Sequence, residues 1–394
     1  MNILSYIIWN FNPEIYSGAI AVRWYGLLFA LGFLISQQVL FYIYKQETDG
    51  TPLAKKNAEK LVENMTVYMI IATIIGARLG HVAFYQPQDY FTSIEGIIRI
   101  FNIREGGLAS HGATIAIPLV LLLFTLYRFN IKEGKASRLF FVRNSRGYSY
   151  LQIMDRIVIV VALTGALIRF GNFTNSEIIG LPTQSDKGVL FVRDATDILT
   201  LYSRSGGLVE SVDYRKNEDG ELNENGHVPI YIYVHFKRGN HNRSDLIAYM
   251  NDANGLLGNR WVEDHIDEPV SHNLDYELIQ GKDGYSARIS TYGIVRHPAQ
   301  LYESITTFAL FIFLFLVWNQ KKRETRPGLL FGLFLVILFT LRFFHEFLKE
   351  NQVAFEDNMA LNMGQWLSIP AVIFGVLVLL YGPKFDRPRQ GTGS

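Results

Sequence analysis

Several stretches of about 20 residues in this chain carry almost no charge, and this feature limits the possible folds most. A helix of about 20 apolar residues crosses the ~30 Å hydrocarbon core of a bilayer. Candidate spans lie at 24–44, 64–85, 108–128, 151–171, 298–318, 328–348 and 363–381. The sequence therefore predicts an all-α polytopic membrane protein with about seven transmembrane helices.

Lysine and arginine are concentrated in alternate connections between these spans, and cytoplasmic loops carry an excess of both residues. The basic connections follow the first, third, fifth and seventh spans, with Lys45, Lys55, Lys56 and Lys60; Lys132, Lys135, Arg138, Arg143 and Arg146; Lys321, Lys322, Arg323 and Arg326; and Lys384, Arg387 and Arg389. The short connections on the opposite side carry only Arg99, Arg104 and Lys349, and residues 1–22 carry none. The segment 172–295 is left out of this count, because long segments translocate largely regardless of charge. We therefore expect the N-terminus outside and the C-terminus in the cytoplasm.

A long polar segment separates the fourth and fifth spans. It contains "VPIYIYVHF" and "ARISTYGIV", which favour strands, and "NEDGELNENG" and "NDANG", which favour turns. We expect a small mixed α/β head on the outer face. The expected organisation is 1–180 for spans one to four, 181–290 for the head, and 291–390 for the remaining spans and a cytoplasmic tail. Residues 391–394, "GTGS", resemble a cloning remnant.

Composition excludes several classes of function. A formal net charge of +1 gives no reason to expect nucleic acid. The absence of cysteine excludes disulfides, thiolate metal sites and a cysteine nucleophile. The nine histidines show no metal-ligand spacing, so we expect no metal and no cofactor. The N-terminus also lacks the basic region of a removable signal peptide.

Ionisable residues from different spans collect near the outer membrane surface. They are Arg78, His111, Arg169, Arg296, Glu303, Arg342, His345 and Glu346. Charge inside a membrane is costly and usually faces a cavity or a partner. Arginine forks suit phosphate, and the outer leaflet presents phosphates as lipid headgroups. The pattern predicts a pocket for an anionic phospholipid. Asp155 and Arg156, at a cytoplasmic end, are expected to snorkel to the interface.

Simpler interpretations exist for each residue taken alone. Arg169 and Arg296 could only anchor their spans at the interface. Arg342 and Glu346, spaced i,i+4, could form a structural ion pair. His111 could be a packing or hydrogen-bonding histidine, and the glycines around it could permit close helix contact.

An imidazole can accept a proton at neutral pH, and lipid binding alone would not need one. No G-x-S-x-G pattern supplies a serine nucleophile. These observations favour direct transfer, in which a base activates an acceptor and arginines stabilise a departing phosphate. An anion transporter is the alternative, although no inverted repeat or pair of broken spans is visible. A receptor or scaffold would leave the arginines unexplained.

The block "RFGNFTNSEIIG", residues 169–180, is the closest match to a family signature. "RWYGLLFALGF", "GARLGHVAFY", "GGLASHG", "RHPAQLYE", "RFFHEF" and "GQWLSIP" match further blocks in the same order. Over about 1–180 and 290–382 the chain resembles the phosphatidylglycerol–prolipoprotein diacylglyceryl transferases of bacterial lipoprotein maturation. Ile168, Thr174 and His81 depart from the family pattern, and none of these departures removes a charged group.

The resemblance implies transfer of the sn-1,2-diacylglyceryl group from phosphatidylglycerol to the lipobox cysteine of a prolipoprotein signal peptide, with release of glycerol phosphate. It places the chain in the bacterial inner membrane with its site facing the periplasm. The implied catalytic residues are His111 as base and Arg169 and Arg296 on the phosphate. The implied substrate-binding residues are Tyr25, Arg78, Asn172, Asn175, Glu177, Gly180, Tyr292, Glu303, Arg342 and Glu346.

Two alternatives remain for these roles. The base could instead be a carboxylate or a phosphate oxygen. Asn172, Asn175 and Glu177 could merely cap a helix start in the head. No polar residue of the predicted site lies in 186–283, so we expect some transfer to a short peptide to persist when a short linker replaces this stretch.

Overall fold

The computed structural model describes residues 5–16, 21–84, 87–100, 110–130, 140–143, 148–201, 207–238, 242–268, 273–281, 284–350, 356 and 359–385. The chain divides into two compact units. The first contains Met1–Phe29, Leu167–Ile305 and Arg342–Gln365, and the second contains Ala30–Ala166, Thr306–Leu341 and Trp366–Ser394.

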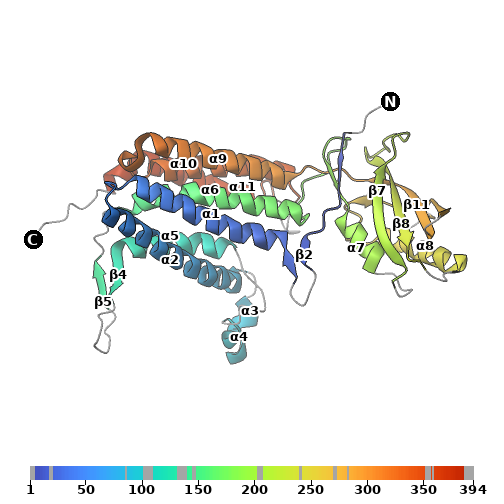
Figure 1. Cartoon of the computed structure of the whole chain (residues 1–394), viewed down its shortest axis with the longest axis horizontal. Coiled ribbons are helices and arrows are strands. Elements are labelled where there is room, and N and C mark those ends of the chain that lie inside the picture. Colours follow the sequence, from blue (N-terminus) through green and yellow to red (C-terminus); the bar gives the residue numbers. More distant parts are fainter. Residues whose placement is uncertain are drawn as a thin grey trace, which may run out of the picture. The chain divides into compact units, whose positions relative to one another are not determined.

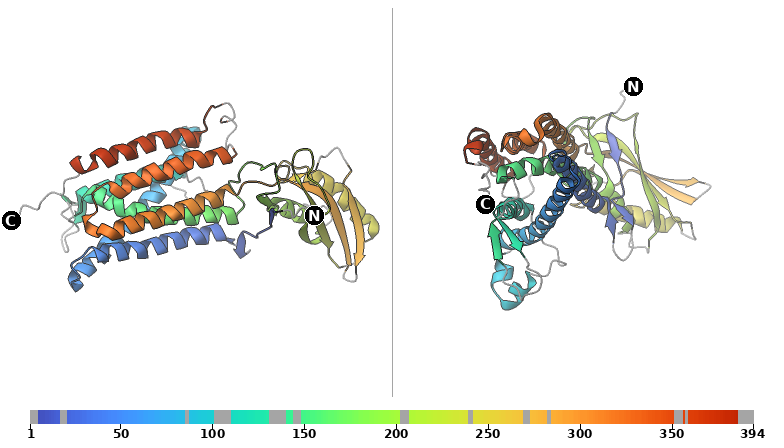
Figure 2. Two further views of the ribbon diagram at one scale, coloured as in Figure 1. Left: turned by 90° about the horizontal axis from the view of Figure 1, so that it is seen from above. Right: turned by 60° about the vertical axis from the view of Figure 1, so that its left-hand side comes forward.

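Long apolar helices build the second unit, where they lie side by side (Figures 1 and 2). Six helices among the described residues are long and apolar enough to cross a membrane. They are α1 (Trp24–Gln46), α2 (Pro52–Phe84), α6 (Tyr150–Thr174), α9 (Ala299–Lys321), α10 (Leu329–His345) and α11 (Met363–Phe385). Within the expected span 108–128, the structure has the shorter helix α5 (Ser110–Leu126), of 17 residues. The protein is a multi-pass membrane protein.

Two boundaries differ from the expected spans. Helix α2 begins at Pro52, so Lys55, Lys56 and Lys60 lie on its first turns and not in a loop. After α5 the chain forms a hairpin of β4 (Tyr127–Asn130) and β5 (Phe140–Arg143). The basic residues expected at 132–138, Arg146 and the tail from 386 onward lie outside the described residues.

Glycines bring α2 and α5 into backbone contact. A Cβ atom at Gly112 would overlap the carbonyl oxygen of Gly76 and lie 2.8 Å from the Cα of Gly80. A Cβ at Gly76 would overlap the side chain of Ala116. Close packing of this kind needs small residues. Gly112 is one of the glycines around His111 for which close helix contact was one interpretation. The first turn of α5, which contains His111, therefore lies against the helix that carries Arg78.

The expectation for Asp155 and Arg156 is wrong. Their side chains do not snorkel, because both are fully buried. The Arg156 guanidinium binds the buried Glu47 carboxylate, with its Nε and NH2 atoms 3.0 and 2.9 Å from Oε1. The Trp318 indole also donates to this oxygen, at 2.7 Å. A carboxylate partner offsets the cost of burying the arginine.

Asp155 caps the start of α10 by accepting hydrogen bonds from backbone N–H groups. Its two carboxylate oxygens accept hydrogen bonds from the backbone N–H groups of Gly328 and Phe331, both at 2.8 Å. The first N–H groups of a helix have no partner within the helix, and a carboxylate is well suited to them.

Asp155→Ala is therefore expected to lower the free energy of unfolding by about 1–2 kcal/mol, the usual cost of losing a helix cap. Thermal unfolding in detergent would measure the change. Asp252→Ala, at an exposed position of helix α8 (Arg243–Leu257), is the control and should change stability by less than about 0.5 kcal/mol. Equal stability of the two variants would show that this cap contributes nothing.

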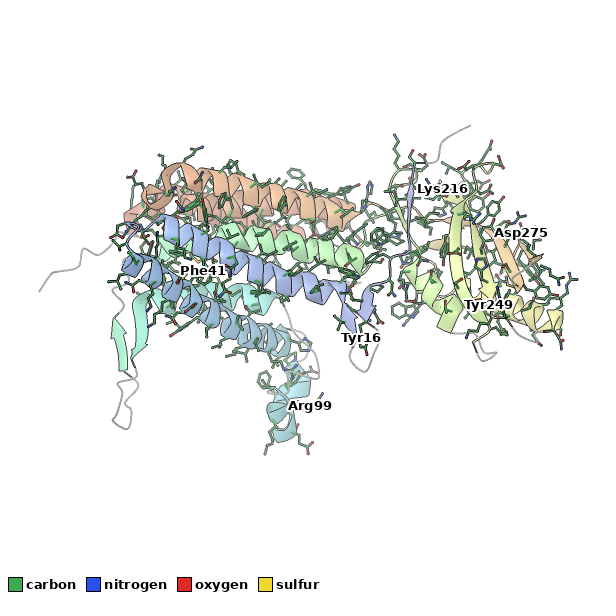
Figure 3. The ribbon with its side chains drawn as sticks, viewed as in Figure 1. Tyr16, Phe41, Arg99, Lys216, Tyr249 and Asp275 are labelled. Atoms are coloured by element: carbon green, nitrogen blue, oxygen red, sulfur yellow. The ribbon has the colours of Figure 1, made fainter. Side chains whose placement is uncertain are left out.

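A five-stranded antiparallel sheet organises the first unit, in the order β10–β11–β8–β7, with β9 paired to β11 (Figure 1). The strands are β7 (Val209–Lys216), β8 (Val228–Phe236), β9 (Ile266–Asp267), β10 (Tyr276–Gly281) and β11 (Gly284–Gly293). The two strands expected from sequence are thus β8 and part of β11. Alternate residues of β8 are buried against helices α7 (Arg193–Leu201) and α8 (Arg243–Leu257). Tyr249 of α8 joins this core and donates to the carbonyl of Leu199 (Figure 3).

The expected turn at "NDANG" is wrong, because these residues lie inside α8. Leu246, Tyr249, Met250, Ala253 and Leu257 are buried along one face of this helix. At its start, the Asp245 carboxylate accepts a hydrogen bond from the Asn242 N–H. A continuous apolar face and this capping contact outweigh the local turn preference of Asn and Gly.

The N-terminal segment is held to the same unit. Strand β1 (Ile7–Trp9) pairs in parallel with β6 (Val189–Phe191), and β2 (Glu14–Tyr16) pairs with β3 (Val22–Arg23) just before α1. Asp186 accepts hydrogen bonds from the backbone and hydroxyl of Ser5, both at 3.1 Å. The backbone bond lowers the pKa of this carboxyl.

Candidate active site

A chain of alternating charges runs through the first unit. Arg169, near the end of α6, places Nε 2.7 Å from Oε2 of Glu303 in the first turns of α9. The other oxygen of Glu303 contacts the Lys349 ammonium. Lys349 also lies 3.5 Å from Oε1 of Glu346, which is 3.6 Å from Nε of Arg342. We call these five residues the ionic network.

The ionic network has an excess of positive charge, since it contains three cations and two carboxylates. The side chains of Arg169 and Arg342 are 26% and 38% exposed. Among the described residues, each guanidinium has its carboxylate neighbour but donates no aligned hydrogen bond. At each arginine, the N–H groups that do not face the carboxylate can therefore bind an anion, and a phosphate matches two such forks.

The signature residues after Arg169 form a tight turn around Glu177. Asn175 and Asn172 donate side-chain N–H groups to its two carboxylate oxygens, at 3.1 and 3.4 Å. Gln300 of α9 donates to the Glu177 carbonyl at 2.6 Å. Asn172 lies in the last turn of α6, Asn175 and Glu177 follow that helix, and the next helix starts at Arg193. The alternative that they cap a helix start is therefore wrong.

Gly180 is the point where three segments meet. Its N–H donates to the carbonyl of His297 at 3.1 Å, and its backbone bridges to Lys349. A Cβ atom here would overlap the His297 carbonyl oxygen and lie 2.7 Å from that of Leu348. Only glycine leaves space for this approach. The close contact holds the signature turn against the start of α9 and the residues after α10.

Arg296 differs sharply from Arg169. Its side chain is 2% exposed. It donates to the carbonyls of Asp264 and Gly180, at 2.7 and 3.2 Å, and to the Glu350 carboxylate. A second contact to Asp264, from NH2 to Oδ1, measures 3.5 Å. Asp264 belongs to the segment 181–290, so this segment supplies a polar contact to the candidate residue Arg296.

The two predicted tyrosines occupy different places. Tyr25, in the first turn of α1, packs against α6, because a Cβ at Gly171 would lie 3.1 Å from its ring. Tyr292 lies on β11 and lines a cavity together with Asp267, Glu268, Asp275 and Thr291. No residue of the ionic network lines that cavity.

Arg78 and His111 belong to the second unit. Arg78 is buried and donates to the carbonyls of Ile100 and Arg99, at 2.9 and 2.6 Å. Arg99 is the last residue of the short helix α4 (Ile94–Arg99), which follows α3 (Pro87–Phe91), and Ile100 comes directly after it (Figure 1). The Arg78 guanidinium also lies over the Tyr90 ring, 5.1 Å from the ring centroid. The side chain of His111 lies outside the described part of the chain.

The structure brings two residues to the candidate site that sequence reasoning did not assign to it, Lys349 and Gln300, and it brings His345, which was named only as part of the charged cluster. Lys349 joins the two carboxylates, and Gln300 holds the signature turn. His345, one turn after Arg342 on α10, interacts electrostatically with Glu303, Glu346 and Arg169. Spacing contained a signal for Lys349, which follows Glu346 by three residues and so falls on the same side of a helix. Gln300 lies inside a recognised block.

Comparisons with known proteins identify the family of this chain. Residues 13–381 match the family model described as prolipoprotein diacylglyceryl transferase. A relative from Tolumonas auensis is 30% identical over 96% of this chain and 98% of its own length. Relatives from Bacteroides fragilis and Chloroherpeton thalassium are each 29% identical, over 97% and 98% of this chain and 98% and 97% of their own lengths. All three are named phosphatidylglycerol–prolipoprotein diacylglyceryl transferase. The match includes the 181–290 stretch that the sequence blocks left out, and this chain belongs to the prolipoprotein diacylglyceryl transferase family.

Proposed function

We propose that this protein transfers the sn-1,2-diacylglyceryl group of phosphatidylglycerol to the lipobox cysteine of a prolipoprotein signal peptide. A carbon–sulfur bond forms, the carbon–oxygen bond to the phosphate breaks, and glycerol phosphate leaves. The thiol proton passes to a base. Family membership and the names of the relatives support this reaction and do not favour the anion transporter. On the structural side, the observation that carries it is the ionic network with its two available guanidinium groups.

Charge development explains how such a network would promote the reaction. The phosphodiester of phosphatidylglycerol has one negative charge, and the departing glycerol phosphate gains a second as the carbon–oxygen bond breaks. Donors aimed at that oxygen bind the transition state more tightly than the substrate. Arg169 and Arg342 would supply these donors, with Glu303 and Glu346 orienting them.

The other predicted residues have supporting roles in this proposal. The resemblance assigns Arg296 to the phosphate as a second clamp. Since its donors bind Asp264, Gly180 and Glu350, it would have to exchange the Glu350 carboxylate for a phosphate oxygen. Tyr25, Asn172, Asn175, Glu177 and Gly180 would shape the headgroup pocket beside Arg169. Arg78 and Tyr292 stay assigned to substrate binding by resemblance.

We also propose the topology expected from sequence. Helix α5 would serve as a seventh span, since 17 residues is the lower limit for crossing the hydrocarbon core. The distribution of lysine and arginine supports an external N-terminus and a cytoplasmic C-terminus. The protein would lie in the bacterial inner membrane, with the sheet of the first unit forming a periplasmic head and the site facing the periplasm.

Purified protein, phosphatidylglycerol vesicles and a lipobox peptide test the reaction directly. We expect a peptide mass increased by one diacylglyceryl group, together with released glycerol phosphate. The chain has no cysteine, so the modified thiol can come only from the peptide. A peptide with serine in place of the lipobox cysteine is the control. Folded protein that yields no product across several lipid compositions would refute the proposal.

A further inference from the structure

Lys349 is a buried lysine in contact with two carboxylates. Its side chain is 2% exposed, and it follows the short 3-10 helix Glu346–Leu348 at the end of α10. A charged ammonium rarely tolerates burial unless it is paired. Its partners are Glu303 on α9 and Glu346 on its own segment.

The two carboxylates connect Lys349 to the two arginines that remain available to an anion. Glu303 contacts Lys349 through Oε1 and Arg169 through Oε2. Glu346 lies within ion-pair distance of both Lys349 and Arg342 through Oε1, and its Oε2 accepts a hydrogen bond from Asn362 at 3.2 Å. Lys349 is therefore the central cation of the network.

We propose that Lys349 is a positioning residue for phosphate binding, acting through Glu303 and Glu346; the inference rests on the function proposed above. Lys349 draws one oxygen of Glu303 away from Arg169 and shares an oxygen of Glu346 with Arg342. Neither carboxylate then chelates its arginine with both oxygens. The guanidinium groups keep their donors for the phosphate.

Lys349 also sets the charge of the site. With it, the network has three positive and two negative charges, a net charge of +1 with His345 neutral. This matches the single negative charge of a phosphodiester and favours the dianionic product still more. Without it, two carboxylates would face two arginines at zero net charge, and both would close onto the guanidinium groups.

The backbone of Lys349 ties this charge to the signature turn. Lys349 forms an isolated antiparallel β-bridge with Gly180, and the Leu348 carbonyl accepts a hydrogen bond from the N–H of Leu181 at 2.9 Å. The side chain thus enters the network from a segment already held against the block that carries Arg169. This attachment gives the ammonium a defined position, which a positioning role requires.

Steady-state transfer and inhibition by glycerol phosphate would test the role. Lys349→Met removes the charge, and Lys349→Arg retains it. Lys187→Met, at an exposed lysine of the same unit, is the control. We expect Lys349→Met to raise the KM for phosphatidylglycerol and the inhibition constant for glycerol phosphate by about 10-fold or more, with kcat/KM falling by up to ~10²-fold. Lys349→Arg should have a KM and an inhibition constant close to those of the wild type, and the Lys187→Met control should match the wild type in both constants.

These readouts separate positioning from structural damage. Partial unfolding would lower the active fraction and therefore kcat, leaving KM and the inhibition constant unchanged. If Lys349→Met does not accumulate in membranes, Lys349→Gln replaces it with the same expected losses, since it retains a donor without the charge. Unchanged KM and inhibition constants in a folded variant, or no recovery by Lys349→Arg, would overturn the inference. A wild-type protein that yields no product would instead refute the proposed reaction.

Discussion

Arg169→Lys is expected to lower diacylglyceryl transfer by about 10²-fold or more while thermal stability stays close to that of the wild type. The charge is retained, but one ammonium cannot reproduce the two-point contact of a guanidinium with phosphate. The lysine could still pair with Glu303, which is the ionic partner of Arg169 among the described residues. Folding should therefore tolerate a change that catalysis does not.

A matched substitution controls for the loss of a guanidinium. Arg193→Lys affects an arginine of similar exposure, 24%, which pairs with Asp197 on α7. We expect this variant to retain wild-type turnover. Initial rates with phosphatidylglycerol and a lipobox peptide, together with unfolding temperatures, give the comparison. If the two lysine variants turn over equally fast, Arg169 is only an interfacial anchor.

His111→Gln is expected to slow transfer by roughly 10²–10⁴-fold, the usual effect of removing a general base. The amide can keep a hydrogen bond but cannot accept the thiol proton. Binding of phosphatidylglycerol should persist, because the substitution leaves all arginines in place. Gly112, the next residue, packs on α2, so glutamine at 111 leaves the glycine contact between the helices intact.

The loss of transfer rate in His111→Gln should depend on pH. A cysteine thiol titrates near 8.5. As pH rises toward that value, more of the peptide arrives as thiolate and needs no base. The relative defect of His111→Gln should therefore shrink from pH 7 to pH 9. A constant defect would indicate a role other than proton transfer.

His345→Gln is the comparison, because this second histidine interacts with the carboxylates of the ionic network. We expect it to be less impaired than His111→Gln at pH 7. The reverse order would assign the proton to His345. Near-normal turnover of both variants would leave Glu303 or the lipid phosphate as acceptor.

Local sequence predicted elements well where one strong preference dominated. Apolar runs identified the long helices, and β-branched alternation identified β8. Local sequence was a poor guide where the polarity or turn preference of a stretch competed with its tendency to form a helix. The lysine-rich first turns of α2 are helical although they are polar, so the helix begins at Pro52, 12 residues before the apolar span that hydropathy outlined from 64. The "NDANG" stretch is helical because the buried face of α8 continues through it.

The sequence by itself determined that this is a multi-pass membrane protein of the transferase family, since span length and ordered blocks are local properties. Only the tertiary structure decided which charges meet. Glu303 and Lys349 lie far along the chain from Arg169, and neither spacing nor composition pairs them. The sequence also did not show that Arg296 donates to Asp264, Gly180 and Glu350, or that the side chain of Arg156 is buried. A charged side chain has many possible partners, and the packing of distant segments selects among them by deciding which partner shares its low-dielectric surroundings.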